Sequence, residues 1–164
     1  MGTNANTKRG IGHWVDHGIA GRAILLDYLS YAQRKGIKYD PFKYHEISWD
    51  ELRECGKSQD VNILPESQGG DIKIGDILLI RSGFVEAYHG KSEAERKAAA
   101  LRVDDHDRAT QQQWAGVKQE EKMLDWIHDC FFAAVAGDAP SFEAWPSRAG
   151  MRFFIYFSGA GIWT

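Results

Sequence analysis

The stretch KQEEKMLDWIHDCFFAAVAGD, which runs from Lys118 to Asp138, combines a helical pattern with a strand pattern. The apolar residues of its first part recur at helical spacing and share one helical face: Met123, Leu124, Ile127 and Cys130. The apolar run Phe131–Ala136 follows without a break and predicts a buried strand that ends at Gly137 and Asp138. Since helices and strands alternate along the chain in α/β domains, this stretch favours that class.

Two earlier segments of the chain also have the pattern of strands. The runs Ala23–Tyr28 and Ile77–Ile80 are apolar and of strand length, and the second lies between Gly75 and Gly83. The loop Leu64–Gly75 is rich in turn residues, and we interpret it as a connector rather than a domain boundary.

Two capping boxes predict where further helices begin. Ser48 with Glu51 heads the segment SWDELRECGKSQ, and Ser92 with Glu95 heads SEAERKAAALR. The resulting order is strand, helix, strand, helix, helix, strand, which indicates a single α/β domain.

Length and composition limit the class of protein. The chain has 164 residues, 43% of them hydrophobic and 26% charged, which is ordinary for one globular domain. Its net charge of -3 gives no basic surface for nucleic acid, and no apolar run is long enough for a membrane span. The first residues lack the apolar core of a signal peptide, and the two cysteines lie far apart in the sequence. These features predict free thiols and a cytoplasmic location.

Asp138 is the leading candidate for a functional residue. It follows the last predicted strand, and the carboxyl ends of central strands are where α/β folds place their sites. Ser141, Glu143 and Trp145 follow in the same loop, and an acid beside an aromatic ring suits a pocket wall. The alternative is that Asp138 and Ser141 only cap or turn the chain around Pro140.

The histidines offer weaker candidates for a site. His13 and His17 are four residues apart, a spacing that can hold zinc, but Trp14 stands where a zinc protease carries its catalytic Glu. The cluster Asp104–Asp107 contains one histidine and reads as a solvated loop. The remaining histidines are isolated and pair with no nucleophile in the sequence: His45, His89 and His128. Neither cysteine neighbours a histidine, so a thiol nucleophile is unsupported.

Five ordered blocks resemble the cyclase family of metal-dependent hydrolases, whose best known activity is kynurenine formamidase (arylformamidase). The blocks are WVDHGIAGRAILLDY (14–28), YDPFKYHEISWDEL (39–52), GDILLIRSGFVEAY (75–88), WAGVKQEEKMLDWI (114–127) and AAVAGDAPSFEAWP (133–146). The match is closest to the fungal and related bacterial branch. It covers about residues 14–146, whereas residues 147–164 depart from the family.

The resemblance implies a fold, a reaction and a cofactor. It implies a swivelling β/β/α-type domain that hydrolyses a small amide, often a formamide or a cyclic amide, in tryptophan catabolism or a related pathway. It also implies a bound divalent metal, zinc or manganese, and assembly as a homo-oligomer. Such a metal lowers the pKa of its bound water toward about 7 and polarises the amide carbonyl.

The family's metal ligands have no counterpart in this sequence. The family places a His-rich motif before the block that begins at Trp14, and a His and a Glu after the block that ends at Pro146. The segment SRAGMRFFIYFSGAGIWT, which follows Pro146, contains no His, Asp or Glu. We therefore expect a partial cyclase-like domain over residues 1–164, truncated at both ends, that binds no metal by itself.

Two hypotheses remain open at this stage. The chain is either an incomplete metal-dependent amide hydrolase, inactive alone, or a non-catalytic relative that at most binds a partner or a small molecule. The resemblance to the family assigns a role to only three residues, as candidates for the wall of the substrate pocket: Asp138, Ser141 and Glu143. We also expect oligomers or aggregates, because MRFFIYF, residues 151–157, is an aromatic, β-prone segment.

Overall fold

The computed structural model of the protein describes residues 18, 20–101 and 112–147. Its strands are β1 (Ala23–Asp27), β2 (His45–Ile47), β3 (Ile77–Arg81), β4 (Ala115–Val117) and β5 (Ala134–Gly137). Its α-helices are α2 (Tyr28–Lys35), α3 (Trp49–Lys57), α4 (Phe84–Gly90), α5 (Glu93–Ala100) and α6 (Glu121–Cys130), and a short 3-10 helix covers Glu66–Gln68.

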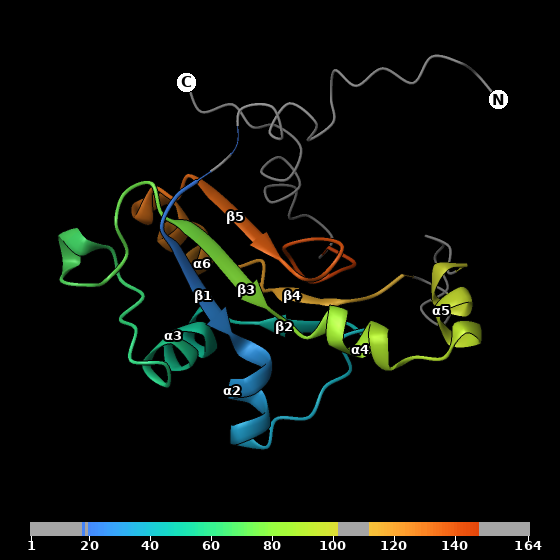
Figure 1. Ribbon diagram of the computed structural model, residues 1–164. Coiled ribbons are helices and arrows are strands. Elements are labelled where there is room, and N and C mark those ends of the chain that lie inside the picture. The colour runs from blue at the N-terminus through green and yellow to red at the C-terminus, as the bar shows by residue number, and fades with distance from the viewer. Residues whose placement is uncertain (1–17, 19, 102–111, 148–164) are drawn as a thin grey trace, which may run out of the picture.

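Two parallel sheets organise these elements (Figure 1). The larger sheet has the order β1-β3-β5, and its register pairs Leu25 with Leu79 and Leu79 with Ala136. The smaller sheet pairs β2 with β4. Parallel neighbours need a crossover between them, and here helices and the smaller sheet supply the connections.

The hydrophobic core lies on one face of the larger sheet. Leu26, Leu78 and Ile80 point inward from β1 and β3 and are at most 5% exposed. Helices α3 and α6 add apolar side chains to the same cluster: Leu52, Cys55, Met123, Trp126 and Cys130. The predicted periodicity of the 118–130 segment is thereby confirmed, because Met123 and Cys130 face the core.

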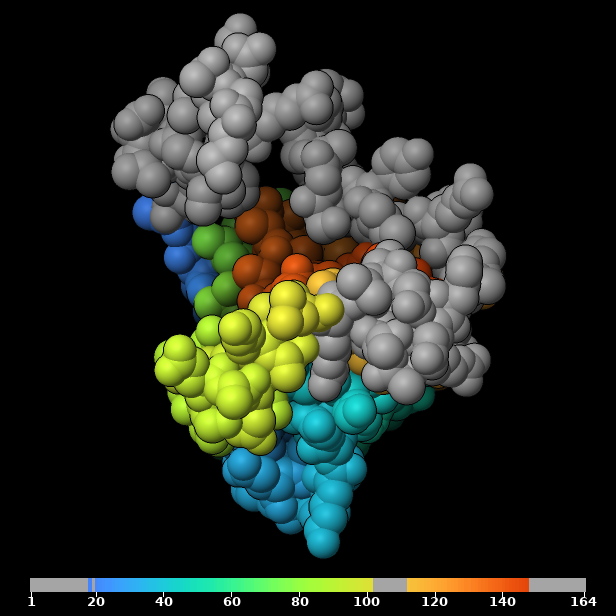
Figure 2. Space-filling model, turned by 90° about the vertical axis from the view of Figure 1, so that its right-hand side faces the viewer, coloured from blue at the N-terminus to red at the C-terminus, as the bar shows by residue number. Residues whose placement is uncertain are grey.

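The outer face of the larger sheet is also apolar, and within residues 18, 20–101 and 112–147 no helix covers it fully. Leu25 of β1 is 48% exposed, and Ala23 and Ala136 are exposed beside the half-buried Ile77 and Leu79. Figure 2 shows atoms of the three strands side by side at the surface. Parallel sheets are normally covered on both faces, so this face is unusual for its kind of sheet.

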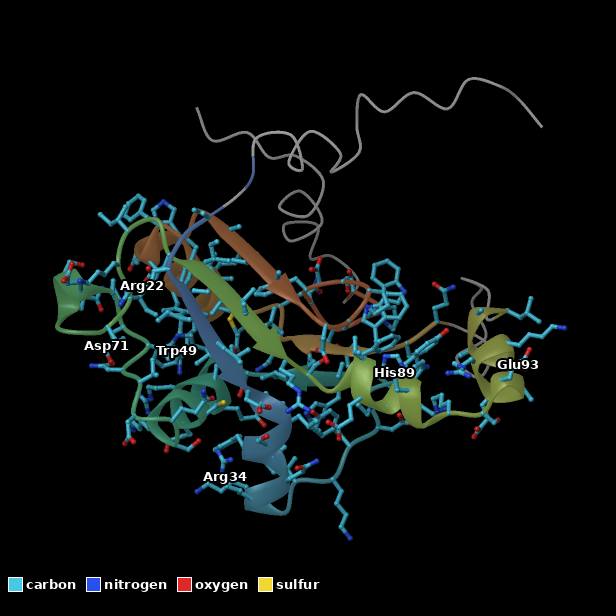
Figure 3. The ribbon with its side chains drawn as sticks, viewed as in Figure 1. Arg22, Arg34, Trp49, Asp71, His89 and Glu93 are labelled. Carbon is cyan, nitrogen blue, oxygen red and sulfur yellow. The ribbon has the colours of Figure 1, made fainter. Side chains whose placement is uncertain are left out.

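The amino ends of β1 and β3 are joined by an ion pair between Arg22 and Asp76. Arg22 donates from Nε to Asp76 Oδ1 over 2.8 Å and from Nη2 to the carbonyl of Asp71 over 2.6 Å (Figure 3). The hydrogen bond from Arg22, partly offset by burial, holds the pKa of Asp76 below its ordinary value. These contacts fasten β1, β3 and the 62–76 loop together, away from the strand ends where the candidate site lies.

The structure confirms several sequence predictions and corrects one. Both capping boxes form, since Ser48 and Ser92 each accept from the backbone N–H three residues on. The strands over 23–27 and 77–81 are also present. The strand predicted over Phe131–Ala136 is present as β5, but its predicted start and burial are wrong: Phe131 has a left-handed conformation and ends α6, and β5 is half-buried to exposed. The strand begins at Ala134 and lies at the edge of the described sheet, not in its centre.

None of the helices in the described part of the chain has the length and apolar character needed to cross a bilayer.

Candidate functional site

Polar side chains gather where the three parallel strands end. Asp27 ends β1, Arg81 ends β3, and Ser82 and Asp138 follow β3 and β5. We call these four residues the carboxyl edge. Arg81 Nη1 donates to both carboxylate oxygens of Asp27, over 2.9 and 3.1 Å, and Arg81 also pairs with Glu86 of α4. Burial opposes ionisation of Asp27, but hydrogen bonds from Ser30 and Arg81 outweigh it and lower its pKa.

Asp138 joins β5 to the turn between β3 and α4. One carboxylate oxygen accepts from the backbone N–H and the hydroxyl of Ser82, over 2.6 and 2.7 Å. The other accepts from the N–H groups of Gly83 and Val85, over 2.9 and 3.4 Å. The first N–H groups of a helix have no partner within it, so Asp138 caps α4 from a distant part of the chain. The alternative of a capping role is therefore supported, but for α4 and not for the turn of Asp138 itself.

Ser141 and Glu143 lie in the loop that follows. Ser141 Oγ accepts from Trp114 Nε1 and donates to the carbonyl of Glu143, both over 2.6 Å. Glu143 is 3% exposed, and burial raises the pKa of its carboxyl above the ordinary value. The backbone around it runs beside β4, since Val117 N–H donates to the carbonyl of Phe142 over 3.0 Å. The pocket-wall role assigned to Asp138, Ser141 and Glu143 stays a prediction.

A second polar group adjoins the carboxyl edge. We call Tyr28, Tyr39, His45 and Glu51 the tyrosine–histidine cluster. The Tyr28 hydroxyl lies 2.9 Å from His45 Nε2 and 2.9 Å from Glu51 Oε1. The rings of Tyr39 and His45 stack with centroids 4.3 Å apart, and the Tyr39 hydroxyl donates to the carbonyl of Ser82 over 2.6 Å. The cluster therefore touches the carboxyl edge through Ser82.

Burial shifts the proton affinities of this cluster. It raises the pKa of Tyr28, and the neighbouring Glu51 raises it further. It also raises the pKa of Tyr39, to which the negative charge of Asp138 adds. Burial lowers the pKa of His45 more than the nearby carboxylates of Glu51 and Glu46 raise it. At neutral pH both phenols are therefore protonated, and His45 favours its neutral form.

An aromatic pocket of 290 Å³ opens beside the carboxyl edge. Its aromatic walls are Phe42, Phe84, Tyr88 and Trp114, and Arg96 and Pro140 also line it. The rings of Phe42 and Phe84 stack with centroids 4.2 Å apart, and Arg96 lies over the ring of Tyr88. Phe84 is the first residue of the helix that Asp138 caps, so the pocket and the carboxyl edge share an element.

Sequence reasoning found Asp138 but missed the tyrosine–histidine cluster. His45 is isolated in the sequence because Tyr28 and Glu51, the residues of its hydrogen-bond chain, lie 17 positions before it and 6 after it on other elements. Asp27 and Arg81 could have been identified as candidate site residues, because each is the last residue of a strand that the sequence predicts.

The described residues do not fit the divalent metal that the resemblance implies. Among them, no three side chains of His, Cys, Asp or Glu are grouped so as to hold a metal ion. The oxygens of Asp27 and Asp138 accept hydrogen bonds from Arg81 and from the α4 turn, and these contacts compete with metal coordination. His13, His17 and the Asp104–Asp107 cluster lie outside the described residues.

Comparison with known proteins identifies a shared fold. No protein-family model and no curated protein matches the sequence. A solved crystal structure described as a novel cyclase matches with a TM-score of 0.53 and 23% sequence identity. The match covers 76% of this chain and 33% of that one, so the chain spans about a third of the length of its structural neighbour. The predicted class is confirmed: the chain has a cyclase-like α/β fold.

Proposed function

We propose that this chain forms the substrate-binding part of an amide hydrolase that resembles the arylformamidases. The observation that carries the proposal is the aromatic pocket, because two of its lining residues, Phe84 and Pro140, each come three residues after the carboxyl end of a parallel strand. That edge is where α/β folds bind their ligands. The cyclase-like fold agrees with the sequence blocks that resemble the same family.

The lining of the pocket suits an aryl amide. Phe42, Phe84 and Trp114 offer ring faces and edges, and aromatic contacts of this kind stabilise a bound ring. Polar groups are joined to the pocket along the chain: Tyr39 lies in the same loop as Phe42, and Ser82, whose carbonyl accepts from Tyr39, comes two residues before Phe84. We infer that the aryl group occupies the pocket while the amide points toward these polar groups.

The described residues supply binding and orientation in this proposal, and none is assigned as a metal ligand. A divalent metal, zinc or manganese, would activate water and polarise the amide when bound. In the proposed enzyme its ligands come from outside residues 18, 20–101 and 112–147.

The test uses formanilide, the simplest aryl formamide, with the 164-residue chain in the presence and absence of zinc or manganese. Formate release measures hydrolysis, and tryptophan fluorescence measures binding. Tyr88 lines the pocket and is 41% exposed, so Tyr88→Ala should raise the dissociation constant about fivefold with little effect on folding.

Tyr44→Ala is the matched control, because Tyr44 is 38% exposed and does not line the pocket. Saturable binding that Tyr88→Ala weakens and Tyr44→Ala does not would support the proposed pocket. Absence of binding in the wild-type chain would contradict it.

A non-catalytic binding module is the second candidate. The observation that favours it is that Asp27 and Asp138 are occupied by structural hydrogen bonds, which leaves them less suited to act as bases. Formate release from formanilide by the chain with zinc or manganese would exclude this candidate.

A further inference from the structure

The aromatic pocket contains a positive charge that a neutral aryl amide would not use. Among the described residues that line the pocket, Arg96 is the only cationic side chain, and none is an Asp or a Glu. A neutral aryl ring is already stabilised by contacts with the aromatic walls and by its burial. The guanidinium of Arg96 therefore points to a further group on the ligand.

The ring of Tyr88 orients the Arg96 guanidinium. The central guanidinium carbon lies 5.4 Å from the centroid of that ring. Tyr88 belongs to α4 and Arg96 to α5, and both residues line the pocket. The planar guanidinium can stack on an aromatic face and still present its N–H groups in the fork that matches a carboxylate. Arg96 is half-buried, which limits the screening of its charge by water.

A second cation lies against another wall of the pocket. Lys91 Nζ lies 4.6 Å from the centroid of the Phe42 ring, and Phe42 lines the pocket. Lys91 comes directly after α4 and two residues before α5, so the connection between these helices brings a second positive charge to the pocket. Lys91 does not line the pocket itself, and its contribution is therefore weaker than that of Arg96.

Neither cation has a carboxylate partner in the part of the chain that the structure describes. None of the ion pairs within residues 18, 20–101 and 112–147 includes Arg96 or Lys91. Glu93 stands one helical turn before Arg96 and forms no ion pair with it in this set. Glu95 accepts from the N–H and the hydroxyl of Ser92, over 2.8 and 2.7 Å. The pocket therefore keeps a positive potential, which attracts anions.

We propose that Arg96 is a specificity-determining residue, which makes the aromatic pocket select ligands that carry a carboxylate on the aryl ring. The inference deepens the proposed function and rests on it for the choice of an aryl amide. An apolar cavity of about 150 Å³ holds benzene. The pocket has 290 Å³, which leaves room for two substituents on the ring. The Arg96 fork donates two N–H bonds to the carboxylate while Phe42 and Phe84 contact the ring.

Three formamidobenzoates test the selection in the wild-type chain. The ring carboxylate of these compounds stands ortho, meta or para to the formamide, and each methyl ester keeps the shape but loses the charge. We expect at least one isomer to bind about tenfold more tightly than its methyl ester, the value of a hydrogen bond to a charged group. Titration calorimetry measures both. If none of the three isomers binds more tightly than its ester, the proposal is wrong.

A pair of variants tests the assignment to Arg96. Arg96→Gln keeps a polar side chain of good helix propensity and should reduce the preference for the acid over its ester about tenfold. Lys97→Gln is the matched control, because it removes the same charge from the next position of α5, which is exposed and does not line the pocket. An equal loss of preference in both variants would mean that the selection comes from overall charge and not from Arg96.

The outcomes separate this proposal from the proposed function. If formanilide binds and the acids gain nothing over their esters, Arg96 is not selective while the aromatic pocket stands. Benzoate, which has no amide, decides the opposite case. If benzoate binds in a way that depends on Arg96 but formanilide and the esters do not bind, the selection of anions is supported and the amide ligand is wrong. If no compound binds, both proposals fail. The comparison of acid and ester uses the wild-type chain, so it does not depend on the folding of a variant.

Discussion

At the scale of single residues, Asp138 connects two parts of the chain that are distant in sequence. Its carboxylate accepts four hydrogen bonds from the turn after β3, although it lies more than 50 residues further along the chain. Such a carboxylate stabilises the start of α4 both by pairing its free N–H groups and by opposing the helix dipole. The side chain is therefore part of the framework that carries Phe84 into the aromatic pocket.

We expect Asp138→Ala to lower the free energy of unfolding by about 2 kcal/mol, because it removes a cap and leaves buried donors unpaired. Asp138→Asn keeps one acceptor oxygen and should cost less. Urea denaturation of both variants measures the difference. If Asp138→Ala unfolds like the wild type but abolishes ligand binding, Asp138 acts on the ligand instead.

His45 should make stability depend on pH. Its pKa is lowered in the folded chain, while the unfolded chain binds a proton near the ordinary value of 6.5. The stability that this difference contributes is present above pH 6.5, and it is lost as the pH falls below that value toward the folded pKa. We expect unfolding free energies of the wild type to fall between pH 7.5 and pH 5 more steeply than those of His45→Phe. Parallel pH profiles would contradict this assignment.

At the scale of elements, β4 and the 142–145 segment approach each other too closely for a side chain. A Cβ atom on Gly116 would lie 2.4 Å from the carbonyl carbon of Glu143 and 2.6 Å from the nitrogen of Ala144. This contact places the candidate loop of Ser141 and Glu143 against the smaller sheet. Gly116 is therefore required by packing rather than by its backbone conformation.

Gly116→Ala should destabilise the chain by about 1–3 kcal/mol, because the backbone must move apart to admit the methyl group. Gly90→Ala is the control, since a Cβ there meets no atom within 4 Å. Thermal denaturation of the two variants compares them. Equal melting temperatures would show that β4 and the loop can separate at little cost.

The elements that the sequence predicted are those with local signals. The helices at Ser48 and Ser92 carry their own capping boxes, and the strands over 23–27 and 77–81 are apolar runs. Helix α4 escaped prediction because its cap, Asp138, comes from another part of the chain. Strands β2 and β4 have three residues each, too few for a periodic pattern, and exist through their mutual pairing. The end of α6 at Phe131 could not be predicted from the sequence, because left-handed helix ends are usually glycine and Phe131 is one of the few non-glycine residues that adopt this conformation.

The same distinction explains the candidate site. Asp138 was found because strand ends are local features, whereas the tyrosine–histidine cluster depends on contacts between β1, β2 and α3. The sequence indicated a capping role as an alternative for Asp138. The helix that it caps could not be predicted without knowing that β3 and β5 are neighbours.

At the scale of the whole molecule, the outer face of the larger sheet predicts self-association. Leu25 and Leu79 are neighbours on this apolar face, and a second copy could cover it as helices cover the opposite face. The segment 151–157, from which the sequence also predicted oligomers, lies outside the described residues.

We expect Leu25→Lys to shift the chain toward monomer in sedimentation velocity, because a charge on the face opposes its burial. Leu101→Lys adds the same charge to an exposed position at the end of α5 and should leave association unchanged. A wild-type chain that is monomeric at all concentrations would contradict the expected homo-oligomer.

The two free cysteines allow the opening of the folded molecule to be timed. Cys55 and Cys130 are buried on α3 and α6, and burial raises the pKa of each thiol to about 12. Since only the thiolate reacts with alkylating reagents, neither side chain should be modified while the core is closed. The rate of iodoacetamide labelling at each cysteine should therefore measure how often the helix that carries it leaves the sheet. Equal rates at both positions would mean that α3 and α6 detach together as one cooperative unit.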